Sequence, residues 1–232
     1  MNIDLKYPTS WVEVSREQLM IISALMLKNL TREEFLFDSF CRLTGIHLLM
    51  RPGQDEDTLS AAYHFKKGKH RFDMPVTAIQ QACEELSFVL DSIGLPDSPL
   101  PGVNSKLYDK TFKQFYFADA YFGRYQETKE MKWLALMCES LTGKQPRLKP
   151  VDAVALTFWW IGLKGHFKKT YPHVFTEGEG SGKSPAETLQ EILSCLNNDK
   201  PQDNKMILDT EVNAVLLALD NIYLKAKTHA DS

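Results

Sequence analysis

Apolar side chains recur every three or four residues along most of this chain, which is the spacing of one face of a helix. Three of these stretches begin with a hydroxyl residue that stands three places before a glutamine or glutamate: Ser15, Thr31 and Ser184. In a capping box, the hydroxyl accepts a hydrogen bond from the third backbone N–H, and the side chain three places on bonds back to the first. The pattern therefore predicts helix starts at these three residues.

The apolar stripes predict seven or eight helices in all. They cover about residues 16–27, 32–44, 77–93, 106–141, 151–169, 185–196 and 209–227. The longest stretch is expected to divide at Gly123 or in the polar residues 126–129. The run from Val151 to Leu163 is apolar nearly all round, which is typical of a helix inside a core. We therefore expect Phe158 and Trp159 in the core of the C-terminal half.

In one stretch, apolar and polar residues alternate with a period of two instead. Tyr63 and Phe65 precede a lysine-rich turn, and Phe72 and Met74 follow it, each separated by polar residues. With Gly68 in the turn, this pattern predicts a β-hairpin near 63–74. Strands do not otherwise alternate with helices, which argues against an α/β nucleotide-binding fold. The predicted fold class is all-α, with about seven to eight helices and one short β-hairpin.

A proline-rich segment separates two helical regions. Pro96, Pro99 and Pro101 all fall within residues 94–104, which is the best candidate linker of the chain. The expected organisation is an N-terminal helical part, 1–93, that contains the hairpin, and a C-terminal helical part, 105–232. A single compact domain remains the alternative.

Composition narrows the class of protein. The chain has 232 residues, of which 44% are hydrophobic and 25% charged, so a disordered protein is excluded. A formal net charge of −3 gives no strong field toward nucleic acid or an anionic membrane. The four cysteines are far apart and are expected to be reduced and buried. No signal peptide or membrane span is recognised, so a cytoplasmic protein without cofactors is expected.

Two motifs invite a chemical interpretation that their residues do not support. The run Gly178–Ser184 is similar to a phosphate loop, but Glu177 stands where the first glycine of that motif is required. His173 and Glu177 have the spacing of two metal ligands on a helix, yet they flank a predicted loop and lack a third ligand. The sequence therefore predicts no catalytic, cofactor-binding or metal-binding residue. An enzyme whose site assembles from scattered residues stays open.

A basic cluster in the predicted hairpin is the one candidate functional surface. It consists of Lys66, Lys67, Lys69, His70 and Arg71. Such a tip could contact an acidic protein or a phosphate backbone. The alternative is a solvated turn whose neighbouring aromatic residues face the core, because alternation alone accounts for their positions.

Several ordered segments carry a resemblance to a known family. They are residues 8–19, 63–75, 112–121, 158–164, 171–175 and 209–227. The set resembles an uncharacterised family of bacterial prophage-like elements, encoded near tail genes, and the resemblance implies a role in phage assembly. The predicted function is a non-enzymatic, helical protein-interaction protein that binds another protein, such as a tail-assembly accessory protein or chaperone. The alternatives are a nucleic-acid or anion-binding accessory protein that uses residues 66–71, and an enzyme with a site not visible in the sequence.

Overall fold

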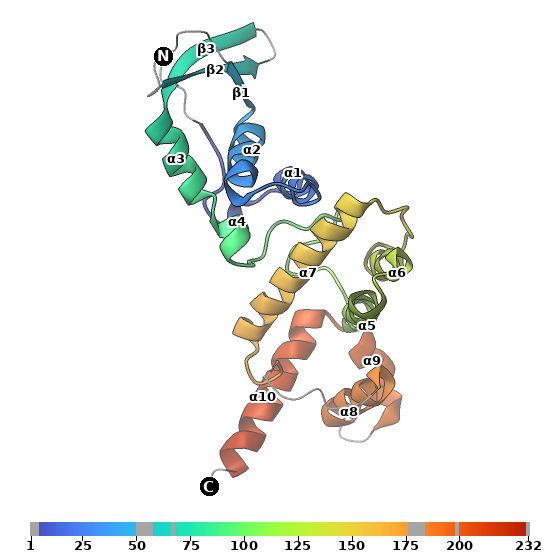
Figure 1. Ribbon diagram of the computed structural model, residues 1–232. Helices are drawn as coiled ribbons and strands as arrows, with labels where there is room; N and C mark the ends of the chain where they lie inside the picture. The colour runs from blue at the N-terminus through green and yellow to red at the C-terminus, as the bar shows by residue number, and fades with distance from the viewer. Residues whose placement is uncertain (1–4, 50–57, 66–67, 176–183, 198–199, 231–232) are drawn as a thin grey trace. The chain divides into compact units, whose positions relative to one another are not determined.

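The computed structural model describes residues 5–49, 58–65, 68–175, 184–197 and 200–230 (Figure 1). These residues are predominantly helical, which confirms the predicted fold class. They form ten α-helices, two more than the upper prediction. The two additions are short: α4 (Phe88–Asp91) follows closely on the preceding helix, and α9 (Asn204–Asp209) lies almost entirely between the helices expected at 185–196 and 209–227.

The chain divides into two compact units. The first comprises Met1–Pro99 and Pro150–Trp159, and the second comprises Leu100–Lys149 and Trp160–Ser232. The boundary at Pro99 falls inside the segment 94–104 expected to be a linker. Residues 150–159 group with the first unit although they lie far beyond this boundary in the sequence, so the units are not two consecutive halves.

The first unit combines helices with a small sheet. Its further elements are η1 (Trp11–Glu13), α1 (Arg16–Met26), α2 (Arg32–Thr44), β1 (Ile46–Leu49), β2 (Thr58–Phe65), β3 (Gly68–Pro75) and α3 (Val76–Glu85). The capping boxes predicted at Ser15 and Thr31 are both present, at the starts of α1 and α2. In Figure 1, α2 and α3 lie side by side, and each connects to the sheet at one end.

The predicted hairpin is present and is longer than expected. Its strands β2 and β3 are antiparallel, with Tyr63 opposite His70 and Leu59 opposite Met74. A third strand, β1, pairs with β2 and makes a three-stranded antiparallel sheet of order β1-β2-β3. This strand begins directly after Gly45, which ends α2 in the left-handed conformation with φ 70°. Four residues are too few to display a period of two, so the pattern did not reveal β1.

Trp11 is the centre of an aromatic cluster in the first unit. Its ring stacks on Phe158 at 5.4 Å between centroids and meets the edge of Phe88 at 5.6 Å. Its indole N–H donates to the carbonyl of Ser92 at 2.7 Å. The expectation that Phe158 lies in the core of the C-terminal half is therefore wrong, because Phe158 packs on a residue near the N-terminus. Trp159 is fully buried, as expected, but like Phe158 it belongs to the first unit and not to the C-terminal half.

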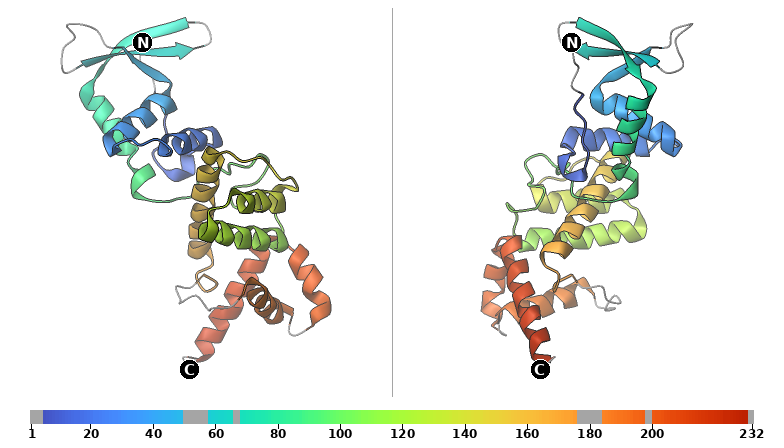
Figure 2. Two further views of the ribbon diagram at one scale, coloured as in Figure 1. Left: turned by 45° about the vertical axis from the view of Figure 1, so that its right-hand side comes forward. Right: turned by 90° about the vertical axis from the view of Figure 1, so that its left-hand side faces the viewer.

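The second unit is built on helices alone within the residues described. Its helices are α5 (Phe112–Thr128), α6 (Met131–Thr142), the second half of α7 (Pro150–Thr170), α8 (Pro185–Asn197), η2 (Pro201–Asp203), α9 and α10 (Val212–Ala230). The expected division of residues 106–141 occurs at Lys129, which adopts φ 57°. Gly123 lies within α5 and does not interrupt it. Figure 2 shows α5 and α6 running side by side in both views.

Trp160 anchors this second core. It is fully buried and lies 5.8 Å from Phe115 and 6.3 Å from Phe122, measured between ring centroids. Its indole N–H donates to Asp119 Oδ1 at 3.0 Å, and Lys164 approaches the same oxygen at 3.0 Å. A carboxylate at the edge of an apolar core needs such partners, because burial disfavours an uncompensated charge.

Two glycines in the structure lead to opposite expectations for the same substitution. A Cβ on Gly94 would lie 2.6 Å from the Cβ of Trp11, whereas a Cβ on Gly123 would meet nothing within 4 Å. We expect Gly94→Ala to lower the free energy of unfolding by about 1–3 kcal/mol, because Trp11 must move. We expect Gly123→Ala to raise it by about 0.5–1 kcal/mol, because alanine favours the helix. Urea denaturation measures both changes, and equal stability of Gly94→Ala and the parent would contradict the close approach.

Candidate functional site

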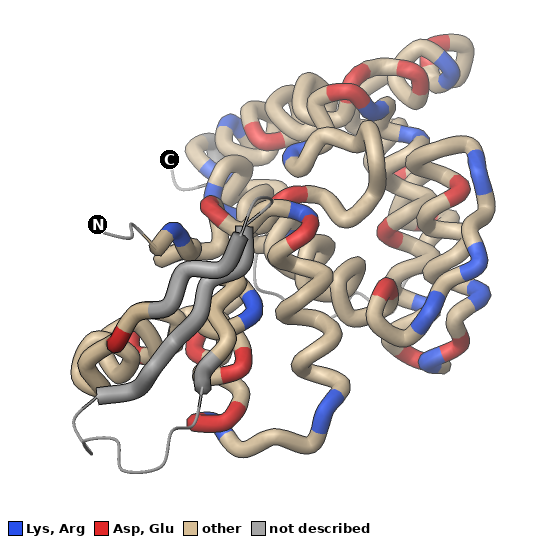
Figure 3. Tube along the Cα trace, turned by 90° about the horizontal axis from the view of Figure 1, so that it is seen from above, with Lys and Arg blue, Asp and Glu red and all other residues tan. Residues whose placement is uncertain are grey.

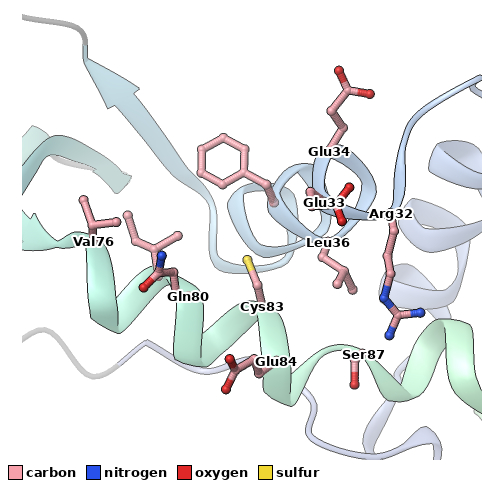
Figure 4. A pocket seen from close by; sticks show the side chains of 11 residues that line it. Arg32, Glu33, Glu34, Leu36, Val76, Gln80, Cys83, Glu84 and Ser87 are labelled. Carbon is pink, nitrogen blue, oxygen red and sulfur yellow. The ribbon is translucent and has the colours of Figure 1, made fainter.

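The candidate site is an apolar groove between α2 and α3 in the first unit (Figure 4). Its volume is about 650 Å³. The floor is formed by uncharged side chains of both helices: Leu36, Phe37, Val76, Ile79 and Cys83. The rim carries Glu33, Glu34, Gln80 and Glu84, and Arg32 and Ser87 close one end. Ligand sites in proteins have volumes of this order and are mostly lined by apolar side chains.

The floor of the groove follows from helical spacing. On α3, Val76, Ile79 and Cys83 stand three and four residues apart, so their side chains lie on one face. Ile79 is buried, whereas Val76 and Cys83 are only partly covered. Burial raises the pKa of the Cys83 thiol, so this side chain is neutral near pH 7 and adds no charge to the floor.

The rim of the groove is acidic because its one arginine is already engaged. Arg32 Nη1 and Nη2 each donate to one carboxylate oxygen of Asp91, both at 2.9 Å. The guanidinium lowers the pKa of the Asp91 carboxyl through this paired hydrogen bond. Among the described residues, the lining therefore presents the carboxylates of Glu33, Glu34 and Glu84 and has no basic side chain other than Arg32.

Glu34 of this rim also caps the N-terminus of α2. Its carboxylate accepts a hydrogen bond from the backbone N–H of Thr31 at 2.8 Å and so completes the capping box of α2. Glu33 and Glu84 lie exposed on the two opposite helices. In Figure 4, the sulfur of Cys83 points from α3 toward α2, while the carboxylate of Glu84 points away from α2. The negative charge therefore lies at the border of the groove and not on its floor.

Two hollows in the second unit each have an ion-paired residue in their lining. One lies beside α5 and the start of α8, where Arg124 and Glu127 of its lining form an ion pair at 3.1 Å. The other lies beside α5 and α7, and its Lys164 is paired with Asp119. Figure 3 shows both signs of charge interspersed along the described chain. The α2–α3 groove differs because its rim is acidic and its floor is apolar.

The basic cluster predicted from the sequence is only partly described. Lys66 and Lys67 lie outside the described residues. The backbones of Lys69, His70 and Arg71 belong to β3, opposite His64, Tyr63 and Ala62 of β2. Their side chains lie outside the description, so a contact through this cluster stays a prediction. The strand that bears them leads directly into α3 and its groove residue Val76.

The two weak motifs are only partly described. Residues 176–183 lie outside the described chain, but Ser184 and Glu187 form the predicted capping box of α8. His173 pairs with Asp220 through Nδ1 at 3.1 Å, and its backbone N–H donates to the same carboxylate at 2.7 Å. This partner was missed because it lies 47 residues away and belongs to no local pattern.

The described residues contain neither a cluster of metal-ligating side chains nor a membrane-spanning helix. No group of three or more histidine, cysteine, aspartate or glutamate side chains among them could hold a metal ion. None of the described helices is both long enough and apolar enough to cross a membrane.

The four cysteines differ in burial, and their reactivity tests this, including that of Cys83 in the groove. Cys195 is exposed, Cys41 and Cys83 are partly covered, and Cys138 is buried. Burial raises the pKa of Cys41 to about 11 and also raises that of Cys83. Because only the thiolate reacts, we expect one fast equivalent with a disulfide reagent at about pH 8, followed by slow reaction of the others. Cys195→Ser should remove the fast phase and Cys83→Ser a slow one; a fast phase that persists in Cys195→Ser would contradict this assignment.

Comparisons with known proteins do not assign the site. No family model matches this chain, and no match was found among curated proteins or solved structures. The groove is therefore defined by its own geometry and charge. The prophage role implied by resemblance stays a prediction.

Proposed function

We propose that this chain is a protein-binding protein that holds a segment of its partner in the α2–α3 groove. The observation that supports this proposal is the combination of an apolar floor with an acidic rim whose one arginine is held by Asp91. An exposed apolar surface bordered by polar residues is typical of an interaction site. The groove lining has one neutral thiol and no histidine, so its chemistry favours binding over bond cleavage.

The shape and charge of the groove favour a particular kind of partner. Two helices side by side form ridges and furrows that accept the apolar face of a third helix. Residues at the border of that third helix would face Glu33 on one side and Glu84 on the other. Lysine or arginine at those positions complements the rim and speeds association at low salt. The expected partner segment is therefore an amphipathic helix with apolar anchors and basic flanks.

A role as a tail-assembly accessory protein or chaperone is compatible with such a groove. Proteins with these roles must hold an apolar segment of another protein until it reaches its own partner. The phage-assembly context is a prediction from the resemblance.

A pair of designed peptides tests the proposal. Both are amphipathic helices with the same leucine stripe, one with lysine flanks and one with glutamate flanks. We expect the lysine peptide to bind at least about tenfold more tightly at low salt, with a difference that shrinks as salt is added. Fluorescence anisotropy with a labelled peptide measures both affinities. Failure of the lysine peptide to bind the parent protein, or equal binding of the two peptides, would contradict the proposal.

Variants of the rim test whether the peptide binds in the groove. The double reversal Glu33→Lys with Glu84→Lys should weaken the lysine peptide by about tenfold and leave folding nearly unchanged, because exposed charges contribute little to stability. The matched control Glu17→Lys with Glu139→Lys makes the same change of net charge at exposed positions outside the groove. We expect this control to bind like the parent. Equal losses in the two variants would indicate a general charge effect and overturn the groove as the site.

A further inference from the structure

The ion pair at the end of the α2–α3 groove joins a residue that lines the groove to one that does not. Arg32 belongs to the lining, whereas Asp91 is not among the described residues that form it. Arg32 Nη1 donates to Asp91 Oδ1 and Nη2 donates to Oδ2, each at 2.9 Å. In Figure 4, the guanidinium extends from the start of α2 toward Ser87, which lies between α3 and α4. The positive charge is therefore placed at one end of the groove.

Two carboxylates attract this guanidinium. The pKa of Arg32 is raised most by its hydrogen bonds to Asp91 and to a smaller extent by the charge of Glu33, the adjacent residue of the rim. Asp91 holds the guanidinium because paired, charge-assisted hydrogen bonds are stronger than electrostatic attraction without them. The bonds from Arg32 also lower the pKa of the Asp91 carboxyl, so this carboxylate is ionised near pH 7.

The position of Arg32 is not explained by α2 itself. Arg32 is the first residue of that helix, where the partial positive charge of the backbone N–H groups favours acidic side chains and disfavours basic ones. Glu33 and Glu34 in the same turn follow this preference. The basic side chain is instead stabilised by an acid from outside the helix, which Asp91 of α4 supplies.

We propose that Asp91 determines which charge the groove selects, by holding Arg32 at the end of the groove and away from the carboxylates of its rim. While the pair is closed, its two charges largely cancel, and the acidic field at the floor comes from Glu33, Glu34 and Glu84. When the Asp91 carboxylate is removed, the guanidinium stays beside Glu33, neutralises part of the rim and repels a basic segment. Asp91 is thus a positioning residue, because it acts on a bound segment through Arg32.

An ion pair with a merely structural role would behave differently. The side chains of Arg32 and Asp91 are 49% and 51% exposed, so their pairing contributes little to stability. If the pair only connected α2 to α4, breaking it from either side would have the same effect on binding. If it sets the charge of the groove, the two sides have opposite effects, because Asp91→Asn leaves an unpaired cation and Arg32→Gln leaves an unpaired anion.

The two designed peptides test the proposal on three variants: Asp91→Asn, Arg32→Gln and the two combined. At low salt, we expect Asp91→Asn to lower the ratio of lysine-peptide to glutamate-peptide affinity by about threefold or more, and Arg32→Gln to raise it by a similar factor. The combined variant should restore the ratio to within about twofold of the parent, because its net charge is that of the parent. Single variants that shift the ratio in the same direction would overturn the proposal.

A matched control separates this effect from a general change of charge. Asp38→Asn makes the same change of charge on α2 and releases Lys28 from an ion pair at 3.6 Å, but neither residue lines the groove. We expect this control to select between the peptides like the parent. A shift as large as that of Asp91→Asn would contradict the assignment to Asp91.

The peptide measurement rests on the proposed function of the groove, so a second measurement uses no peptide. Cys83 lies in the floor, where its thiol reports the local potential. In a background of Cys41→Ser with Cys195→Ser, it is labelled with two methanethiosulfonates, one with a trimethylammonium group and one with a sulfonate group, and the modified cysteine is identified by mass spectrometry. We expect the cationic reagent to react faster with the parent. The ratio of rates should fall in Asp91→Asn and rise in Arg32→Gln, each by about twofold or more.

The two measurements distinguish failure of this proposal from failure of the proposed function. Reagent ratios that shift as expected, in a protein that binds neither peptide, would refute the groove as a protein-binding site and support the role of Asp91. A parent that binds the lysine peptide, with peptide and reagent ratios that do not respond to Asp91→Asn, would refute the role of Asp91 and leave the function of the groove standing.

Discussion

The indole of Trp11 organises the first unit and indirectly sets the charge of its groove. Its N–H donates to the carbonyl of Ser92, and its ring stacks on Phe158, so it joins the N-terminal segment, the end of α4 and the first half of α7. Ser92 is adjacent to Asp91, the residue that holds Arg32. By positioning the end of α4, the buried indole keeps that carboxylate where it engages the arginine of the groove. The acidic character of the rim therefore depends on packing beneath it.

The helix starts could be predicted because their hydrogen bonds join residues close together in the sequence. The tertiary contacts could not be predicted because they join residues far apart. Each capping box is contained in four residues, so its donors and acceptors are visible in the sequence. The short strand β1 could not be predicted in this way, because it depends on its pairing with β2 and is too brief for a period. The contacts of Phe158 with Trp11 and of His173 with Asp220 join residues far apart in the chain. No spacing rule reports such contacts.

The exposed apolar surfaces could not be predicted from the sequence for a related reason. A stripe of apolar residues predicts which face of a helix is buried, but not how much of that face its own protein covers. Cys83 belongs to the predicted stripe of α3, yet it remains partly open because α2 covers only part of it. On α10, the predicted stripe is the inner face, and the exposed Leu217 and Leu224 lie outside it. Only the folded structure shows which apolar side chains stay exposed to solvent.

What covers such positions is decided by the polar groups beside them. Apolar contact is non-directional, so the floor of the groove alone would accept many partners. The carboxylates of Glu33 and Glu84 disfavour an acidic segment through repulsion and favour a basic one. Discrimination by unfavourable pairing is how specific interfaces reject wrong partners. The same reasoning favours a segment with basic flanks as the occupant of the proposed groove site.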